Sequence, residues 1–581
     1  MFLVSYLILG GEVVWRAIKN ITRGQIFDEN FLMSVATIGA FAIGDFPEAV
    51  AVMLFYQIGE YFQDMAVRRS KKSIAELMDI RPDFANLRKD GDINRVAPDI
   101  VNIGDVIVVK PGEKIPLDGV VIEGESMLDT MALSGESVPR KASVSDTVLS
   151  GCINQSGVLT IEVTKTFDES TVAKIIDLVE NANSKKAPTE NFITTFSKYY
   201  TPVVVGLAAL LAVIPPLFLG GLWAEWINRG LIFLVISCPC AFVVSIPLGF
   251  FGGIGGASKK GVLVKGSNYL EALNNLDIVV FDKTGTLTKG VFKVTNIIPA
   301  NDYSEEALLE ITANAEAFSN HPIAMSVLKA YGREADKDKI SGYMEISGYG
   351  ISVVVGGKKV LAGNHKLMQL ENIGFTESDD IGTKIYVAVD GAFAGCIVIS
   401  DEIKADSKAA IAELKSKGVR KTVMLTGDNP QIAEAIAKEL QLDEVYAGLL
   451  PDQKVEKVEI LNGQKSPKGK LAFVGDGIND APVLARADVG IAMGGLGSDA
   501  AIEAADVVLM TDEPSKLGDA IDVAKFTKRI VWQNIIFALG IKGVFLVLGA
   551  FGVASMWEAV FADVGVSILA ILNAMRVIRM K

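Results

Sequence analysis

Long stretches of the chain contain almost no charged residue, and these stretches predict membrane-spanning helices. A helix needs about 20 mostly apolar residues to cross the hydrocarbon core of a bilayer. Between these stretches lie long segments in which charged residues interrupt short apolar runs. We therefore expect a multi-pass membrane protein with seven spanning helices and several water-exposed domains. The expected helices lie at 2–27, at 31–61 (two helices broken around Asp45-Phe46-Pro47), at 199–224, between Arg229 and Lys259, at 530–557 and at 559–575.

The polar segments differ in pattern, and the differences predict three water-exposed domains. Short β-branched runs with turn signals between them predict an all-β domain at 67–190. Apolar strands that alternate with helical patterns predict a parallel α/β domain formed by 262–289 and 397–525. The insertion between its two parts, 290–396, is expected to be an α+β domain. The membrane helices are then expected within 1–66, 191–261 and 526–581.

The composition agrees with a membrane protein that also has large soluble domains. Of 581 residues, 50% are hydrophobic and the mean hydropathy is +0.36, yet 22% are charged. The net charge of −13 argues against a nucleic-acid partner, because no basic face of the needed size is evident. Four cysteines are too few for a disulfide framework.

Apolar strands of the predicted α/β domain end in polar groups suited to phosphoryl transfer. One strand ends at Asp282, which opens the run Asp-Lys-Thr-Gly-Thr-Leu-Thr, and another ends at Gly-Asp476-Gly. Ligands bind at the carboxyl ends of parallel strands, where Asp282 could attack a phosphoryl group and Asp476 could hold Mg²⁺. Thr426, at the end of a third strand, suits a phosphate oxygen, and Lys454 is a candidate cation for the developing charge.

The segments Asp282–Thr288, Thr426–Asp428 and Gly475–Asp480 resemble the phosphorylation domain of P-type ATPases, and the resemblance extends over nearly the whole chain. It implies that Asp282 is phosphorylated by ATP, with a haloacid-dehalogenase-like fold around it. It also implies a Mg²⁺ ion on Asp282, the Thr284 carbonyl and Asp476. The residues implied for this site are Asp282, Thr284, Thr426, Lys454, Asp476, Asn479 and Asp480.

Two further segments resemble the other cytosolic domains of that family. Leu-Ser-Gly-Glu136-Ser, in the all-β segment, resembles the dephosphorylation loop of the actuator domain. This resemblance implies that Glu136 orients the water that hydrolyses the aspartyl-phosphate. Segments of the insertion resemble the nucleotide pocket of the heavy-metal class, which implies that the insertion binds ATP. The residues implied for this pocket are Glu316, His321, Gly348, Gly350 and Asn364.

The Cys238-Pro239-Cys240 segment lies within an expected membrane helix and predicts a site for soft metal ions. Proline can unwind the helix so that both thiols turn toward one point. Thiolates select Cu(I), Zn²⁺ and similar ions over Na⁺ or Ca²⁺. Ionisable groups inside a membrane are costly and by default functional. Asp563 could add an oxygen ligand, and Lys542 could pair with it or act as a built-in counter-cation.

Lys542 and Asp563-Val-Gly resemble the zinc, cadmium and lead branch of the metal pumps. The implied activity is ATP-driven export of Zn²⁺, Cd²⁺ or Pb²⁺, with Glu48 and Glu60 as carboxylates on the release and uptake routes. A copper(I) pump is the nearest alternative. A membrane-anchored phosphatase of the haloacid-dehalogenase type is less favoured, because it would require neither Glu136 nor cysteines in the bilayer.

The resemblance and the charge pattern also predict orientation and partners. Use of ATP requires the soluble domains to face the cytoplasm, and the basic clusters after the helices agree with this orientation under the positive-inside rule. We expect the protein in the plasma membrane. The basic segment Arg16, Lys19 and Arg23 resembles a docking platform for a cytosolic metal donor. Family members usually begin with a cysteine-bearing metal domain and one further helix, and the resemblance starts at the second helix. We expect a monomer.

Overall fold

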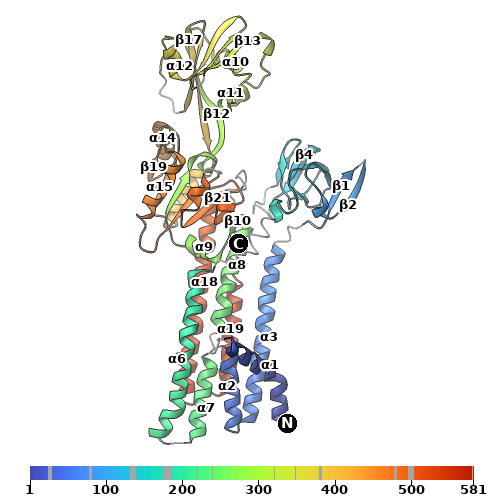
Figure 1. The fold of residues 1–581 in the computed structure, drawn as a ribbon, viewed down its shortest axis with the longest axis vertical. Coiled ribbons are helices and arrows are strands. Elements are labelled where there is room, and N and C mark those ends of the chain that lie inside the picture. The colour runs from blue at the N-terminus through green and yellow to red at the C-terminus, as the bar shows by residue number, and fades with distance from the viewer. Residues whose placement is uncertain are drawn as a thin grey trace. The chain divides into compact units, whose positions relative to one another are not determined.

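The computed structural model divides the chain into two compact units, Met1–Asn275 with Asp519–Lys581, and Leu276–Gly518 (Figure 1). Three predicted site residues, Glu136, Cys238 and Asn479, lie outside the described part of the chain, and only the backbone of Cys240 lies inside it. The described residues are 1–23, 29–77, 82–89, 91–130, 139–173, 186–218, 220, 222–237, 240–319, 321–346, 348–377, 382–476, 480–494, 503–578 and 580.

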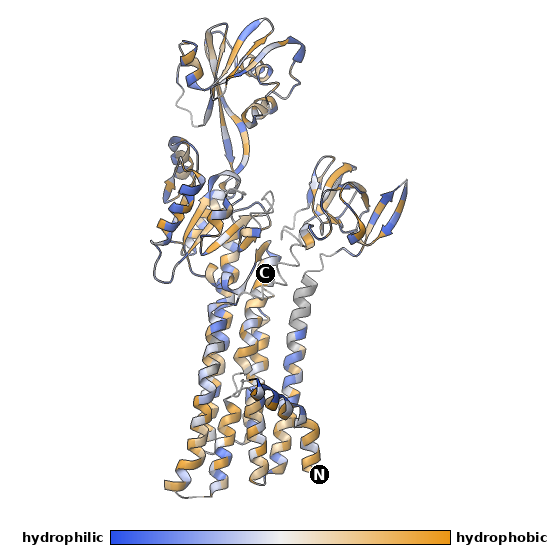
Figure 2. Cartoon of the chain, viewed as in Figure 1, coloured by the Kyte–Doolittle hydropathy of each residue, from blue (hydrophilic) through white to orange (hydrophobic). Residues whose placement is uncertain are grey.

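Long helices dominate the first unit, and hydrophobic residues predominate along most of them (Figure 2). Within the described residues, four segments are long and apolar enough to cross a membrane: Tyr199–Phe218, Trp223–Lys259, Lys516–Ala550 and Met556–Ala574. The other three predicted spans coincide with helices α1, α2 and α3, whose place in the membrane stays a prediction. The helices are α1 (Phe2–Thr22), α2 (Glu29–Ala42), α3 (Phe46–Leu77), α6 (Pro188–Phe218), α7 (Trp223–Ile236), α8 (Cys240–Lys259), α18 (Lys516–Ala550) and α19 (Met556–Ala574).

Several of these helices are longer than the apolar pattern predicts, among them α18, which begins at Lys516 rather than at 530. Helix α3 continues to Leu77 rather than ending near 61, and α6 begins at Pro188 rather than at 199. Apolar runs identify the part of a helix that can lie in hydrocarbon, whereas polar residues with good helix propensity can continue it into water.

Small residues let the helices of the bundle approach one another closely. A Cβ atom on Gly39 of α2 would lie 2.6 Å from Leu231 of α7, and one on Gly59 of α3 would lie 2.4 Å from Val564 of α19. Such positions are typical of helix contacts in membranes, where close van der Waals packing replaces the hydrophobic effect. The buried cluster around them includes Val52, Met53, Val235, Met556 and Val560.

The all-β segment of the first unit folds into two antiparallel sheets. Apolar side chains of the larger sheet, such as Ile107, Val121 and Ile161, are fully buried and form its core. The strand orders are β2-β1-β3-β9-β4-β7 and β6-β5-β8. The strands are β1 (Ala85–Lys89), β2 (Asp92–Val96), β3 (Val106–Val109), β4 (Gly119–Glu123), β5 (Ser126–Asp129), β6 (Arg140–Ala142), β7 (Thr147–Val148), β8 (Ile153–Asn154) and β9 (Leu159–Val163), with a 3-10 turn η1 (Pro98–Ile100); β10 (Val262–Val264) and α9 (Ser267–Leu273) follow α8.

A parallel sheet forms the base of the second unit. Its strands run in the order β22-β21-β20-β11-β18-β19, and apolar side chains such as Ile278, Val280 and Phe473 are completely buried. Burial on both faces explains why these strands are continuous apolar runs in the sequence. The elements are β11 (Leu276–Asp282), β18 (Lys421–Leu425), β19 (Glu444–Tyr446), β20 (Lys470–Gly475), β21 (Val489–Met493) and β22 (Val507–Leu509), with α13 (Ser407–Ser416), α14 (Pro430–Leu440), α15 (Pro451–Asn462) and α16 (Ala481–Leu484).

The insertion forms an antiparallel sheet in the order β12-β17-β16-β15-β14-β13. Its two longest strands, β12 (Thr288–Pro299) and β17 (Ala392–Ile403), pair side by side from Thr288 opposite Ile403 to Pro299 opposite Gly395 and join the insertion to the parallel sheet (Figure 1). The other elements are β13 (Ile340–Ile346), β14 (Gly350–Val355), β15 (Lys358–Gly363), β16 (Thr383–Val389), α10 (Glu305–Ala315), α11 (Pro322–Tyr331), α12 (His365–Leu370) and the 3-10 turn η4 (Lys337–Lys339).

Candidate functional site

Three neighbouring strands of the parallel sheet end at the same level, and each delivers a polar side chain there. Asp282 is the last residue of β11 and lies opposite Leu425 of β18, which directly precedes Thr426. On the other side, Phe281 lies opposite Val474 of β20, two residues before Asp476. The structure therefore brings these three predicted groups together at one edge of the sheet.

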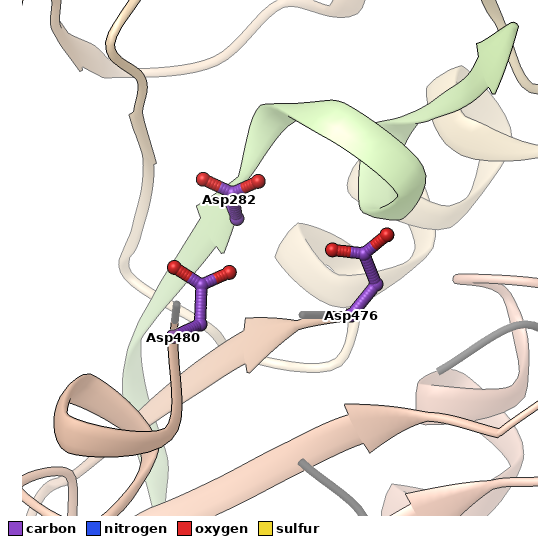
Figure 3. Close-up of side chains that lie close together, drawn as sticks. All are labelled: Asp282, Asp476 and Asp480. Carbon is purple, nitrogen blue, oxygen red and sulfur yellow. The ribbon is translucent and has the colours of Figure 1, made fainter. Parts of the chain in front are cut away.

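The carboxylates of Asp282, Asp476 and Asp480 lie close together, and one oxygen from each lies within 4.8 Å of the others (Figure 3). The Lys454 ammonium donates to Asp282 Oδ1 at 2.5 Å and to Asp480 Oδ1 at 3.1 Å. The Thr284 backbone N–H donates to the other Asp282 oxygen at 3.0 Å. Three carboxylates beside one ammonium leave an excess of negative charge. Such a set of hard oxygen donors fits a divalent cation such as Mg²⁺.

Burial and mutual repulsion shift the acid–base equilibria of this cluster. Burial, and then the neighbouring Asp480, raise the pKa of Asp282 above its ordinary value, while Lys454 opposes the rise. Burial and Asp480 raise the pKa of Asp476 to about 6. Although burial disfavours its charge, the carboxylates of Asp282 and Asp480 raise the pKa of Lys454. Full ionisation of the cluster is therefore costly until a further positive charge arrives.

The loop after Asp282 must have a glycine at position 285. Gly285 lies in the turn Lys283–Leu287 with φ of +72°, and a Cβ atom there would lie 1.5 Å from Asp476 Oδ2. Its carbonyl accepts a 2.5 Å hydrogen bond from Lys404, whose side chain also pairs with Asp512 at 3.2 Å. The sequence prediction did not include Lys404 or Asp512. The position of Lys404 directly after the apolar strand β17 is the signal that could have identified it.

A second group of charges lies beside the turn Lys283–Leu287 that follows Asp282. Lys283 forms an ion pair with Asp428 and lies 3.9 Å from Asp401. The Thr288 hydroxyl lies 2.5 Å from Asp401 Oδ2 and 2.9 Å from the Lys283 carbonyl. The Asp428 N–H donates to the Thr426 hydroxyl at 3.1 Å, which orients that hydroxyl at the sheet edge. Asp401 was also absent from the prediction, although it ties β17 to the loop that follows Asp282.

The insertion contains a cavity of about 310 Å³ that brings the predicted nucleotide residues together. Glu316, His321, Gly348, Gly350 and Asn364 all line it. The Asn364 side chain donates to the Gly348 carbonyl at 2.9 Å, which fixes the glycine loop. A Cβ atom on Gly350 would lie 2.3 Å from the Ala362 carbonyl, so this close approach of two strands requires glycine.

Two of the ionisable residues that line this cavity, His321 and Glu316, have surroundings that affect what they can offer a ligand. His321 caps α11, because its Nδ1 accepts the Ile323 N–H at 3.3 Å. In the neutral ring this leaves the proton on Nε2, which can then donate to a ligand. Glu316 is 8% exposed, and burial raises its pKa to about 7, with Glu345 adding to the rise. The cavity therefore offers a donor at His321 and a carboxyl group that is only partly ionised at neutral pH.

Lys542 and Asp563 form an ion pair between α18 and α19, and the lysine is almost completely buried. The Lys542 ammonium also lies 3.4 Å from the carbonyl of Ile236, the last residue of α7. The pair is thus next to the end of the helix that leads into Cys238, as expected for groups that share one metal site. The unwinding expected at Pro239 falls outside the described residues.

Glu48 and Glu60, the predicted pathway carboxylates, lie on α3. Glu48 Oε1 accepts the Met556 N–H at 2.9 Å and so caps the first turn of α19. Met556 precedes Asp563 by seven residues, which is about 10 Å along a helix, so Glu48 is not part of the Lys542–Asp563 pair. Glu60 is half-buried and follows Gly59, the point where α3 touches α19.

Comparison with known proteins decides the family. A model of haloacid dehalogenase-like hydrolases matches residues 276–488, and a model of the P-type ATPase actuator domain matches residues 79–180. The chain is 63% identical over 582 residues to a cadmium, zinc and cobalt-transporting ATPase of Bacillus subtilis (strain 168), covering 100% of this chain and 83% of the relative. The chain belongs to the metal-transporting P-type ATPases. This ATPase is also 57% identical to a zinc-transporting ATPase of Synechocystis sp., covering 99% of the chain and 80% of that relative.

Among solved structures, the ATPase is similar to a crystal structure of a zinc-transporting PIB-type ATPase in the E2.Pi state. The TM-score is 0.66 at 37% identity, with 100% of this chain and 95% of the other covered. The predicted family, enzyme class and multidomain membrane fold are therefore confirmed. The alternative of a membrane-anchored phosphatase is excluded, because an actuator domain and relatives that span the whole chain accompany the hydrolase-like domain.

Proposed function

We propose that this P-type ATPase exports Zn²⁺ and Cd²⁺ from the cytoplasm and that Asp563, Cys238 and Cys240 bind the transported ion. The observation that carries the proposal is the buried Lys542–Asp563 pair beside the end of α7. A carboxylate at this place supplies the oxygen ligand and the negative charge that a divalent ion requires and that Cu(I) does not. The names of the relatives support the same cargo, and Pb²⁺ stays a prediction.

In the proposed reaction, a carboxylate oxygen of Asp282 attacks the γ-phosphorus of ATP, the bond from that phosphorus to the bridging oxygen breaks, and ADP leaves. The Thr284 N–H orients the Asp282 carboxylate, and the Lys454 ammonium stabilises charge that develops on the transferred group. The hydroxyl of Thr426 donates to a phosphate oxygen. Asp282, Asp476 and the Thr284 carbonyl would hold Mg²⁺, which neutralises phosphate charge, with Asp480 and Asn479 completing the site.

Hydrolysis of the aspartyl-phosphate is proposed to depend on Glu136. Its carboxylate orients a water molecule that attacks the phosphorus, the bond to Asp282 breaks, and inorganic phosphate leaves. The cycle couples to transport because the ion binds one conformation more tightly than the other. Lys542 pairs with Asp563 in the structure, and we propose that the return of Lys542 to that carboxylate helps to displace the ion.

The ion's proposed route through the membrane passes Glu60 and Glu48 on α3. Glu60 lies on the uptake side and Glu48 on the release side, where it must leave the Met556 N–H before it can accept an ion. The basic second half of α1, with Arg16 and Lys19, receives the ion from a cytosolic donor. We place the ATPase in the plasma membrane as a monomer.

The test is metal flux into sealed vesicles that contain the full chain, with and without ATP. We expect vanadate-sensitive uptake and ATP hydrolysis with Zn²⁺ and Cd²⁺, and loss of both in Asp282→Asn but not in the surface control Asp302→Asn. Asp563→Ala is expected to abolish stimulation by Zn²⁺, whereas Glu558→Gln, on the same helix, is not. Stimulation by Cu(I) alone would overturn the assignment of the ion.

A further inference from the structure

We propose that Lys384 binds the phosphate groups of ATP and directs the triphosphate from the cavity around Glu316 and His321 toward Asp282. The inference rests on the proposed nucleotide function of that cavity. It goes beyond the residues implied by family resemblance, because Lys384 belongs to none of the motifs that carry it.

The first observation is the charge of the cavity. Two carboxyl groups, from Glu316 and Glu345, line it together with His321. Among its described lining residues, Lys384 is the one lysine. A nucleotide triphosphate carries several negative charges, and two acidic neighbours repel them. A cation inside the cavity is therefore needed, and the flexible stem of a lysine lets its ammonium follow a phosphate group as a point charge.

The second observation is the place of Lys384 in the sheet. It is the second residue of β16 and lies opposite Val398 of β17, while Thr383 lies opposite Ile399. Val398 precedes Asp401 by three residues, which is about 10 Å along a strand. Asp401 touches Thr288 at the end of the phosphorylation loop. Lys384 thus lies beside the part of β17 that leads to Asp401 and the loop after Asp282, the direction in which the phosphates of a bound nucleotide would have to extend.

The third observation is a second cavity, of about 260 Å³, that shares one lining residue, Thr383, with the first. The second cavity is also lined by Lys283, Asp401 and Asp428, the charged group beside Asp282. The residue that lines both cavities is thus the neighbour of Lys384 in the chain. In the proposed path, a nucleotide with its base near Glu316 and His321 extends past Lys384 toward Lys283.

The test measures the KM for ATP of the metal-stimulated ATPase in the full chain. We expect Lys384→Ala to raise this KM by about tenfold, since a charge-assisted hydrogen bond is lost. Lys384→Arg keeps the charge and should stay within about twofold of the wild type. Lys358→Ala, an exposed lysine on β15 of the same domain, is the matched control and should leave the KM unchanged. Labelling of Asp282 by inorganic phosphate, which needs no nucleotide, shows whether each variant still folds.

A competition assay separates a phosphate contact from a purely structural role. In this assay ATP, ADP and AMP compete with a fluorescent ATP analogue. Lys384→Ala should weaken the binding of ATP far more than the binding of AMP. An equal loss for ATP and AMP would overturn the proposal, because it would place the effect at the base or in the fold. His321→Ala tests the cavity itself. If His321→Ala raises the KM and Lys384→Ala does not, only the role of Lys384 is wrong. If His321→Ala also has no effect, the cavity is not the nucleotide site and both proposals fail.

Discussion

Replacing Glu316 by glutamine tests whether burial of this carboxyl group limits the stability of the domain formed by the insertion, residues 290–396. Burial raises the pKa of Glu316 from 4.5 to about 7. The folded domain therefore holds this proton more tightly than the unfolded chain does. The contribution of the group to stability is full below pH 4.5 and is lost as the pH rises through 7. Glutamine cannot ionise, so the variant escapes this loss.

The size of the effect follows from the difference between the two pKa values. A shift from 4.5 to about 7 corresponds to about 3 kcal/mol at about 1.4 kcal/mol for each unit. At pH 8 we expect Glu316→Gln to exceed the wild type in the free energy of unfolding of this domain by up to that amount. Below pH 4.5 the two proteins should converge, because Glu316 is then protonated in the folded domain and in the unfolded chain alike.

Hydrogen exchange of the full chain, read by mass spectrometry over β14 and β15, measures this difference locally. After correction for intrinsic exchange rates, about 3 kcal/mol corresponds to about a hundredfold change in protection between about pH 4 and pH 8. Glu377→Gln, at an exposed position of the same domain, is the matched control. The same loss of protection in the wild type and in Glu316→Gln would refute the reasoning.

Three further substitutions test contacts elsewhere in the molecule. Gly285→Ala puts a methyl group 1.5 Å from Asp476 Oδ2, and we expect about a hundredfold loss of phosphoenzyme labelled from ATP. Lys542→Met leaves the Asp563 charge buried and unpaired, which should lower the free energy of unfolding by about 3–5 kcal/mol in a thermal unfolding assay without added metal. Adding Asp563→Asn should recover most of this stability. No recovery would contradict the pairing. Glu48→Ala removes the cap of α19 and should cost about 1 kcal/mol in the same assay, whereas Glu48→Gln, which keeps an acceptor, should cost less.

The meeting of Asp282, Thr426 and Asp476 at one edge of the sheet could be predicted from the sequence, because each residue is marked by a local signal. Asp282, Thr426 and Asp476 each follow an apolar run, and parallel strands bring the ends of such runs to one edge. Asp401 and Lys404 could not be placed in the same way. Lys404 contacts Gly285, which is 119 positions away in the chain, and only the pairing of β12 with β17 brings the two together.

The membrane helices were predicted where apolar runs occur, but their ends were not. The extension of α3 to Leu77 and the start of α6 at Pro188 lie in polar sequence that hydropathy does not report. The capping of α19 by Glu48 was also hidden, because the two residues that form it are 508 positions apart. Glu48, predicted for the ion pathway, thus also accepts a hydrogen bond from Met556 that no local sequence pattern could have predicted.

The paired strands β12 and β17 form a long two-stranded arm that carries the insertion and is anchored at its base near Thr288. Twelve residues of β12 extend over about 40 Å, so a rotation of about 5° at Thr288 would displace the far end by about 3 Å. The stiffness of that pivot comes from a few polar contacts, chiefly Thr288 with Asp401 and Lys404 with the Gly285 carbonyl. If the insertion binds ATP as proposed, these contacts set how accurately the terminal phosphate meets Asp282. A substitution at these contacts would then raise the KM for ATP although the cavity around Glu316 is intact.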